Sequence, residues 1–119
     1  QQVKTEKSGL FGELPSDFAT PLALVINELV TNAVEHGLAG RAGTVWLIAD
    51  RSEEEDGEEL LTVTIADDGV GLPDTPHVEG LGLQIVRTLV TSELGGTIAW
   101  HPRDGGGTAV QIRLSLAAR

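Results

Sequence analysis

Apolar residues recur at helical spacing in two segments of the chain. In the first segment, residues 20–37, the apolar positions are Leu22, Val25, Ile26, Leu29, Val30 and Ala33. Thr20 is a suitable N-cap, and Pro21 suits the first position of a helix. The second segment covers residues 82–94 and stops before Gly95, a residue typical of helix C-termini. The pattern therefore predicts two helices.

Segments rich in β-branched and apolar residues predict two antiparallel hairpins. The first pairs residues 44–50 with 60–66 across an acidic turn that contains Gly57, and the second pairs 97–102 with 108–116 across a glycine-rich turn. Residues 9–18 predict a weak strand before the first helix. This order of elements predicts an α+β two-layer sandwich, in which helices cover one face of a mixed, mostly antiparallel sheet.

Composition limits the kinds of function that fit. The 119 residues suffice for one domain, and no cysteine is present to form disulfides or thiolate metal sites. A formal charge of −10 with only eight scattered Lys and Arg residues argues against nucleic-acid binding. No run of apolar residues reaches the length of a membrane span. We therefore expect a cytoplasmic domain with no direct membrane contact.

The first predicted helix carries a carboxylate and an amide on one face. Glu28 and Asn32 are four residues apart, so both side chains can reach one target. An amide oxygen is a good ligand for Mg²⁺, and a neighbouring carboxylate can orient or deprotonate a hydroxyl or a water. The alternative is a solvent-facing polar stripe, which would consist of Asn27, Glu28, Thr31, Asn32 and Glu35.

Residues 65–71 place an aspartate at the end of a predicted strand. A rigidly held Asp67 could accept a hydrogen bond from an exocyclic amine such as that of adenine. Gly69 and Gly71 would let the backbone approach a ligand closely. The alternative is an ordinary turn, since Asp-Gly is a common turn dipeptide.

Residues Gly80-Leu81-Gly82-Leu83 directly precede the second helix. Free amides and the helix dipole favour an anion such as phosphate there, although an ordinary loop has the same composition. Taken together, an oxygen-ligand pair, an amine-reading aspartate and an anion-binding helix start match the requirements of Mg·ATP.

Four segments resemble the conserved boxes of the ATP-binding catalytic domain of bacterial sensor histidine kinases, in the gyrase, Hsp90, histidine kinase and MutL superfamily. Residues 27–37 resemble the N box, 67–71 the G1 box and 80–83 the G2 box, and Gly107-Thr108 resembles the late Gly-Thr of the adenine site. The resemblance extends from about Leu10 to Leu116. It implies the Bergerat type of ATP-binding sandwich.

The resemblance also implies a role for individual residues. Asn32 would bind Mg²⁺, Glu28 would orient or activate the accepting group, and Asp67 would bind the adenine amino group. Thr108 would assist through a water. The remaining implied contacts are Gly69 and Gly71 around adenine, Gly80, Leu81, Gly82 and Leu83 at the phosphates, and His36 near the phosphates. Residues 73–79 would form the lid.

Three features depart from the common pattern of the family. Glu35 stands where many members have lysine, and the lid is short and lacks a Phe-rich box. The wording of the N box is closer to soluble kinases with an alternative dimerisation hairpin. The Trp-x-Glu signature of one such class is nevertheless missing, since Leu47 and Ile48 follow Trp46.

The implied activity is transfer of the ATP γ-phosphoryl group to a histidine on a separate dimerisation domain, with a response regulator as the further partner. Residues 1–8 would be a linker and 9–119 the catalytic domain. His77 and His101 are not expected to be acceptors. Two alternatives are an anti-sigma-type serine kinase of the same superfamily and a nucleotide-sensing module that transfers nothing.

Overall fold

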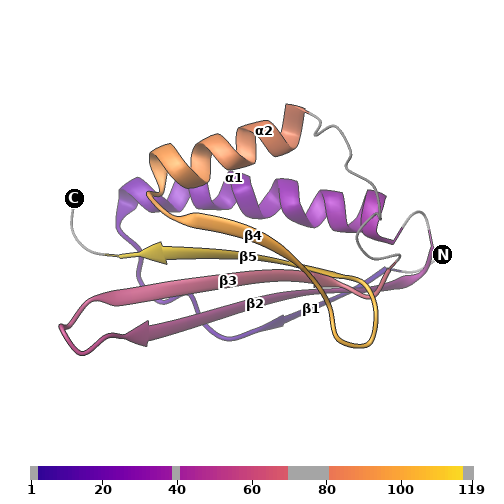
Figure 1. The fold of residues 1–119 in the computed structure, drawn as a ribbon, viewed down its shortest axis with the longest axis horizontal. Coiled ribbons are helices and arrows are strands. Elements are labelled where there is room, and N and C mark those ends of the chain that lie inside the picture. The colour runs from indigo at the N-terminus through magenta and orange to yellow at the C-terminus, as the bar shows by residue number, and fades with distance from the viewer. Residues whose placement is uncertain (1–2, 39–40, 70–80, 117–119) are drawn as a thin grey trace.

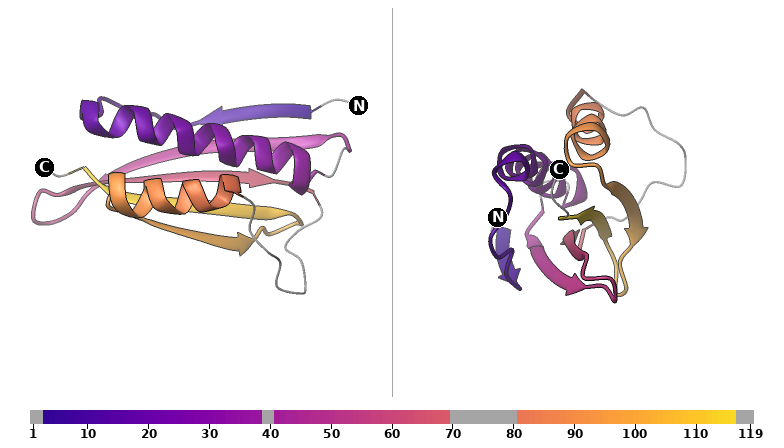
Figure 2. Two further views of the ribbon diagram at one scale, coloured as in Figure 1. Left: turned by 90° about the horizontal axis from the view of Figure 1, so that it is seen from above. Right: turned by 90° about the vertical axis from the view of Figure 1, so that its left-hand side faces the viewer.

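The computed structural model describes residues 3–38, 41–69 and 81–116. They form an α+β sandwich in which α1 and α2 lie side by side on one face of a five-stranded sheet (Figures 1 and 2). The elements are β1 (Val3–Ser8), α1 (Ser16–Asn32), β2 (Gly43–Glu53), β3 (Glu59–Asp67), α2 (Leu81–Thr88), β4 (Thr97–Pro102) and β5 (Thr108–Ser115). The predicted fold class is confirmed.

The sheet has the strand order β1-β2-β3-β5-β4. Strands β1 and β2 are parallel, whereas every other neighbouring pair is antiparallel. Both predicted hairpins are confirmed, and the first one is longer than expected. Its acidic tip is exposed and turns at Gly57, which has a φ of +87°. The centre of the sheet is thus β3, with β2 and β5 on either side.

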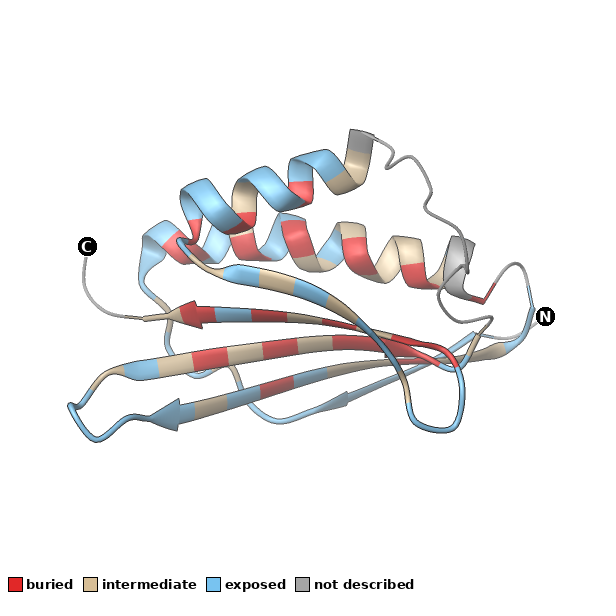
Figure 3. Cartoon of the chain, in the orientation of Figure 1, coloured by how far each residue is buried: buried red, intermediate tan, exposed pale blue. Residues whose placement is uncertain are grey.

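The core lies between the sheet and the two helices. Because side chains alternate across a strand, every second residue of β2, β3 and β5 faces the helices. Most of these positions are buried, as the red bands in Figure 3 show. The largest fully buried side chains are Phe18, Leu22, Leu29, Leu38, Leu61, Ile65, Leu94, Ile112 and Leu114. This aliphatic layer fixes α1 and α2 above the sheet.

The beginning of the chain differs from the sequence prediction. Residues 9–18 do not form a strand: helix α1 begins at Ser16 instead of Thr20, and Pro21 lies inside it. Phe18 is 1% exposed, and its burial favours a helical turn ahead of the proline. The edge strand is formed instead by Val3–Ser8, within the predicted linker. Within the described ranges, no helix is long and apolar enough to cross a membrane.

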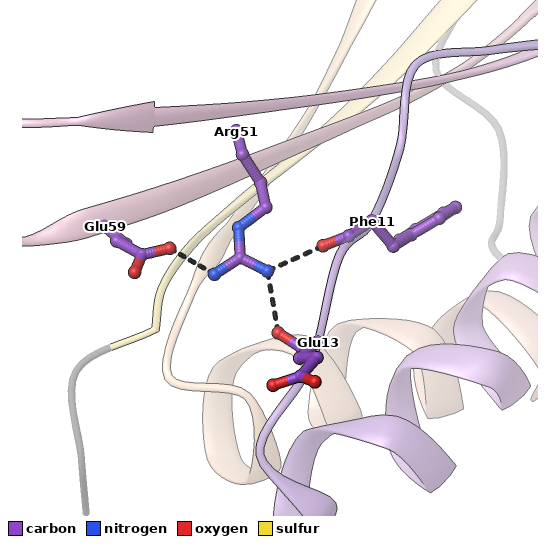
Figure 4. Close-up of polar contacts among 4 residues, drawn as sticks. All are labelled: Phe11, Glu13, Arg51 and Glu59. Atoms are coloured by element: carbon purple, nitrogen blue, oxygen red, sulfur yellow. Dashed lines mark hydrogen bonds and ion pairs between the residues drawn. The ribbon is translucent and has the colours of Figure 1, made fainter.

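The segment between β1 and α1 is held against the sheet by one arginine. Arg51 Nη1 donates hydrogen bonds to the carbonyl oxygens of Phe11 (2.8 Å) and Glu13 (2.7 Å), and its Nη2 pairs with Glu59 (Figure 4). Gly9, with a φ of +79°, passes so close to β2 that a Cβ atom there would lie 1.8 Å from the carbonyl oxygen of Ala49. These contacts connect β1 to the start of α1.

Candidate nucleotide-binding site

Three of the predicted motifs lie at the same end of the sandwich. The end of α1, the end of β3 and the start of α2 all point to the end opposite the β2–β3 hairpin tip (Figure 1). This arrangement follows from the topology, since α1 and α2 run in opposite directions above the sheet. Residues far apart in sequence are thereby brought together.

Glu28 lies directly against the start of α2. A Cβ atom built on Gly82 would lie 2.6 Å from Glu28 Oε2 and 3.1 Å from Oε1. Gly82 is the second residue of α2, and the first N–H groups of a helix have no partner within it. The carboxylate of Glu28 in the N-box segment therefore lies beside Gly82 of the G2-box segment.

Asp67 is a buried carboxylate at the end of the central strand. It is 4% exposed, and its Oδ1 accepts a hydrogen bond of 2.9 Å from the N–H of Gly69. Its partner on the neighbouring strand β5 is Thr108, which is 9% exposed. Among the described residues no cationic side chain forms an ion pair with Asp67. A buried carboxylate without a cation is costly unless hydrogen-bond donors surround it.

Gly107, the last residue of the loop before β5, lies against Asp67. It has a φ of +95°, and a Cβ atom on it would lie 1.9 Å from the carbonyl oxygen of Asp67 and 2.8 Å from the Cα of Asp68. Only glycine fits this position, because both the backbone conformation and the contact exclude a side chain. The late Gly-Thr pair is thus in direct contact with the strand end that carries Asp67.

Asp68 forms a contact that the sequence analysis did not assign. Its Oδ1 accepts a hydrogen bond of 2.9 Å from the N–H of Thr44, and a Cβ atom on Gly43 would meet both Asp68 Oδ1 and the Leu38 side chain. The start of β2 therefore lies against both Asp68 and Leu38, the residue that follows the N-box segment. Asp68 and Thr44 are 24 positions apart, so no local sequence signal indicated this hydrogen bond.

Asn32 is the last residue of α1 and is half-buried. The helix continues to Gly37 as predicted, but its last turn, Ala33–Gly37, is π-helical instead of α-helical. Such turns change the angular spacing between residues and are frequent at functional sites. His36 therefore does not continue the α-helical spacing of Glu28 and Asn32, and its side chain lies outside the described part.

Some predicted contacts fall elsewhere. Gly71, Gly80, His77 and the lid at 73–79 lie outside the described residues, as does the side chain of Leu81. Leu83 is half-buried and packs against the core. His101 is exposed on β4, away from the helices.

The side-chain oxygens at this end of the sandwich suit a Mg²⁺ ion that is held mainly by the phosphates of a bound nucleotide. Within residues 3–38, 41–69 and 81–116, no cluster of three or more His, Cys, Asp or Glu side chains could hold a metal. Mg²⁺ bound with a nucleotide needs only one or two protein oxygens, because phosphates and waters supply the others. The amide of Asn32 fits this requirement, whereas a dedicated protein cage is not found in the described part.

Comparison with known proteins agrees with this geometry. Residues 18–118 match the family described as histidine kinase-, DNA gyrase B-, and HSP90-like ATPase. The chain therefore belongs to this family of ATPases.

Its relatives within the family are sensor histidine kinases. It is 41% identical over 122 residues to the sensor histidine kinase PdtaS of Mycolicibacterium smegmatis, covering 98% of this chain and 23% of PdtaS. It is 38% identical over 111 residues to the blue-light-activated histidine kinase 2 of Erythrobacter litoralis, covering 88% of this chain and 30% of that protein. The chain thus spans about a quarter of the length of these relatives.

A solved structure of a histidine kinase domain is also similar to this chain. The histidine kinase domain of the blue-light-activated kinase EL346 from Erythrobacter litoralis superimposes with a TM-score of 0.77 at 34% identity, covering 96% of this chain and 52% of that one. These comparisons support the predicted histidine kinase ATPase domain over the anti-sigma-type serine kinase alternative.

Proposed function

We propose that this chain is the ATP-binding, phosphoryl-donating domain of a sensor histidine kinase. It would bind Mg·ATP and donate the γ-phosphoryl group to a histidine on a dimerisation domain elsewhere in the full-length protein, from which a response regulator would receive it. The observation that carries the proposal is the contact of Glu28 with Gly82 at the end of the sandwich where Asp67 is buried.

Asp67 would bind the base. Its Oδ1 already accepts the Gly69 N–H, so the carboxylate is fixed in one orientation. The adenine amino group would donate a hydrogen bond to it, and Thr108 on the adjacent strand would assist through a water. A charged acceptor forms a strong hydrogen bond in such buried surroundings. Gly69 and Gly71 would shape the same pocket.

Asn32 and the start of α2 would bind the triphosphate and its metal. The Asn32 amide oxygen would coordinate Mg²⁺, and the amides of Gly80, Leu81, Gly82 and Leu83 would bind phosphate oxygens. Because the chain carries a net charge of −10 and Glu28 lies at this place, metal and amides must provide the charge compensation. Glu28 would orient the accepting histidine, with His36 near the phosphates.

We further propose that residues 9–119 are the catalytic unit and that residues 1–8 connect it to the rest of a cytoplasmic kinase. Strand β1 lies within this connection and pairs with β2 along the edge of the sheet. Phosphoryl transfer would then depend chiefly on positioning and on metal electrostatics, as is general for this reaction.

Calorimetric titration with Mg·ATP tests the binding proposal. We expect a dissociation constant in the micromolar range, roughly the usual scale for such substrates. Asp67→Asn should weaken binding at least about tenfold, because a hydrogen bond to a buried charged acceptor is worth about 1.5–3 kcal/mol. Asp68→Asn is the matched control, since that exposed carboxylate already accepts the Thr44 N–H. Equal affinity of wild type and Asp67→Asn would remove Asp67 from the adenine role.

Glu28→Gln separates phosphoryl transfer from mere nucleotide sensing. In the full-length protein this variant should retain ATP affinity but lose autophosphorylation, measured with radiolabelled ATP. A wild-type protein that binds ATP and phosphorylates no histidine would instead support the sensing module.

A further inference from the structure

The sheet face opposite the helices carries two alanines, flanked by a tryptophan and a histidine, directly behind the proposed adenine site. Trp46, Ala66, Ala109 and His101 are neighbours in register across β2, β3, β5 and β4. Ala66 precedes Asp67, and Ala109 follows Thr108. Because side chains alternate along each strand, this row points away from the helices. Ala66 is nevertheless only 5% exposed, so this face is covered at that point.

Arg103 reaches across this face from the loop between β4 and β5. Its guanidinium carbon lies 4.1 Å from the centre of the Trp46 ring, within the range of a cation–π contact. The loop bends to the side opposite the helices (Figure 1). Since β3 and β5 lie between β2 and β4, the contact spans the two strands that carry Asp67 and Thr108.

The same arginine closes the loop that supports Asp67. Arg103 Nη1 donates a hydrogen bond of 3.0 Å to the carbonyl oxygen of Gly106, and its backbone N–H donates one of 3.0 Å to that of Gly107. Gly107 in turn lies against the carbonyl group of Asp67. A continuous series of contacts therefore runs from Trp46 through Arg103 and the loop to Asp67.

We propose that Arg103, stacked on Trp46, is a positioning residue of the adenine site. The stack holds the 103–107 loop under the ends of β3 and β5, so that Asp67 and Thr108 keep the spacing that the base requires. Arginine suits this role because its planar group stacks and donates a hydrogen bond at once, whereas the ammonium of lysine is a point charge. The inference rests on the proposed function, since it presumes that Asp67 binds the adenine amino group.

A second arginine–tryptophan pair in the chain provides a matched control. Arg87 on α2 lies 4.6 Å from the centre of the Trp100 ring on β4. Trp100 faces the helices and pairs with Val110, two residues beyond Thr108. Arg87→Gln therefore removes a contact of the same chemistry that does not involve the 103–107 loop.

The first experiment compares ATP and adenosine binding by calorimetry in wild type, Arg103→Gln, Arg103→Lys and Arg87→Gln. Arg103→Gln should weaken both ligands by about fivefold, the scale of one cation–π contact. Arg103→Lys should recover part of the affinity, and Arg87→Gln should stay within about twofold of wild type. Adenosine is uncharged, so an equal loss for both ligands separates positioning from simple attraction of the triphosphate. A loss confined to ATP, or one equal to that of Arg87→Gln, overturns the proposal.

A double-mutant cycle gives an independent test. Trp46→Leu keeps an apolar side chain but removes the aromatic face, and it should reproduce most of the loss of Arg103→Gln, which also removes the hydrogen bond to Gly106. The double variant should lose no more than Arg103→Gln alone, because that substitution already removes the stack. Additive losses would overturn the stack as the cause. A wild-type chain that binds neither ligand would overturn the proposed function and this inference with it, whereas normal binding in all Arg103 variants overturns this inference alone.

Discussion

Strand β3 carries a carboxylate at each end, and the two lie in opposite surroundings. Glu59 at its start is 48% exposed at the side chain and forms an ion pair with Arg51 on the neighbouring strand. Asp67 at its end is 4% exposed and accepts a backbone N–H instead. The exposed pair is a structural contact of small energetic weight, as surface ion pairs generally are. The buried carboxylate retains acceptor capacity at the end of the sandwich that also holds the end of α1 and the start of α2 (Figure 1).

The largest expected effect is at the glycine beneath Asp67. Gly107→Ala should lower stability by about 2 kcal/mol more than Gly106→Ala, measured by urea unfolding, and should weaken ATP binding at least about tenfold. Both glycines have positive φ, +95° and +109°, but a Cβ atom meets Asp67 only from position 107, while position 106 is open. Similar losses for both variants would mean that backbone strain alone matters and that the contact with Asp67 does not.

A smaller effect is expected at the start of α2. Gly82→Ala places a Cβ atom within 3.1 Å of both Glu28 carboxylate oxygens, so this flexible side chain must move. Stability should hold or rise by about 1 kcal/mol, because alanine favours helix over glycine. Autophosphorylation of the full-length protein should fall about tenfold, since small displacements at a reacting group are costly. In a protein that already carries Glu28→Gln, Gly82→Ala should lower autophosphorylation little further. A further tenfold fall there would show that Gly82→Ala does not act through Glu28.

The long periodic elements were predictable from the sequence because their signals are local. Both hairpins lie close to their predicted bounds, since turn residues and apolar spacing determine them. The second helix also does so when the π-helical turn Leu89–Glu93, which follows α2, is included. The start of the chain was not predictable in this way. Pro21 suggested a helix start, but burial of Phe18 extends the helix back to Ser16. Tertiary packing thus outweighed a local propensity.

In the candidate site, too, local features were predictable from the sequence and tertiary contacts were not. The motifs that contain Glu28, Asp67 and Gly82 were recognisable, because each residue type suits its proposed chemistry. Their contacts depend on how separate strands and helices meet, which a single sequence does not display. The π-helical turn after Asn32 is of this kind, as is the approach of Gly107 to Asp67.

The smallest effects on ATP binding should occur at the exposed end of β3. Arg51→Gln removes two hydrogen bonds to the carbonyl oxygens of Phe11 and Glu13, so it should lower the free energy of unfolding by roughly 2 kcal/mol. Glu59→Gln removes only the half-exposed ion pair and should cost about 0.5 kcal/mol. Neither variant should alter the ATP dissociation constant, because the β2–β3 hairpin tip lies at the end of the sheet opposite Asp67 (Figure 1). A change in ATP affinity with Glu59→Gln, measured by the same calorimetry, would show that the two ends of β3 are coupled and would contradict the contrast drawn between its two carboxylates.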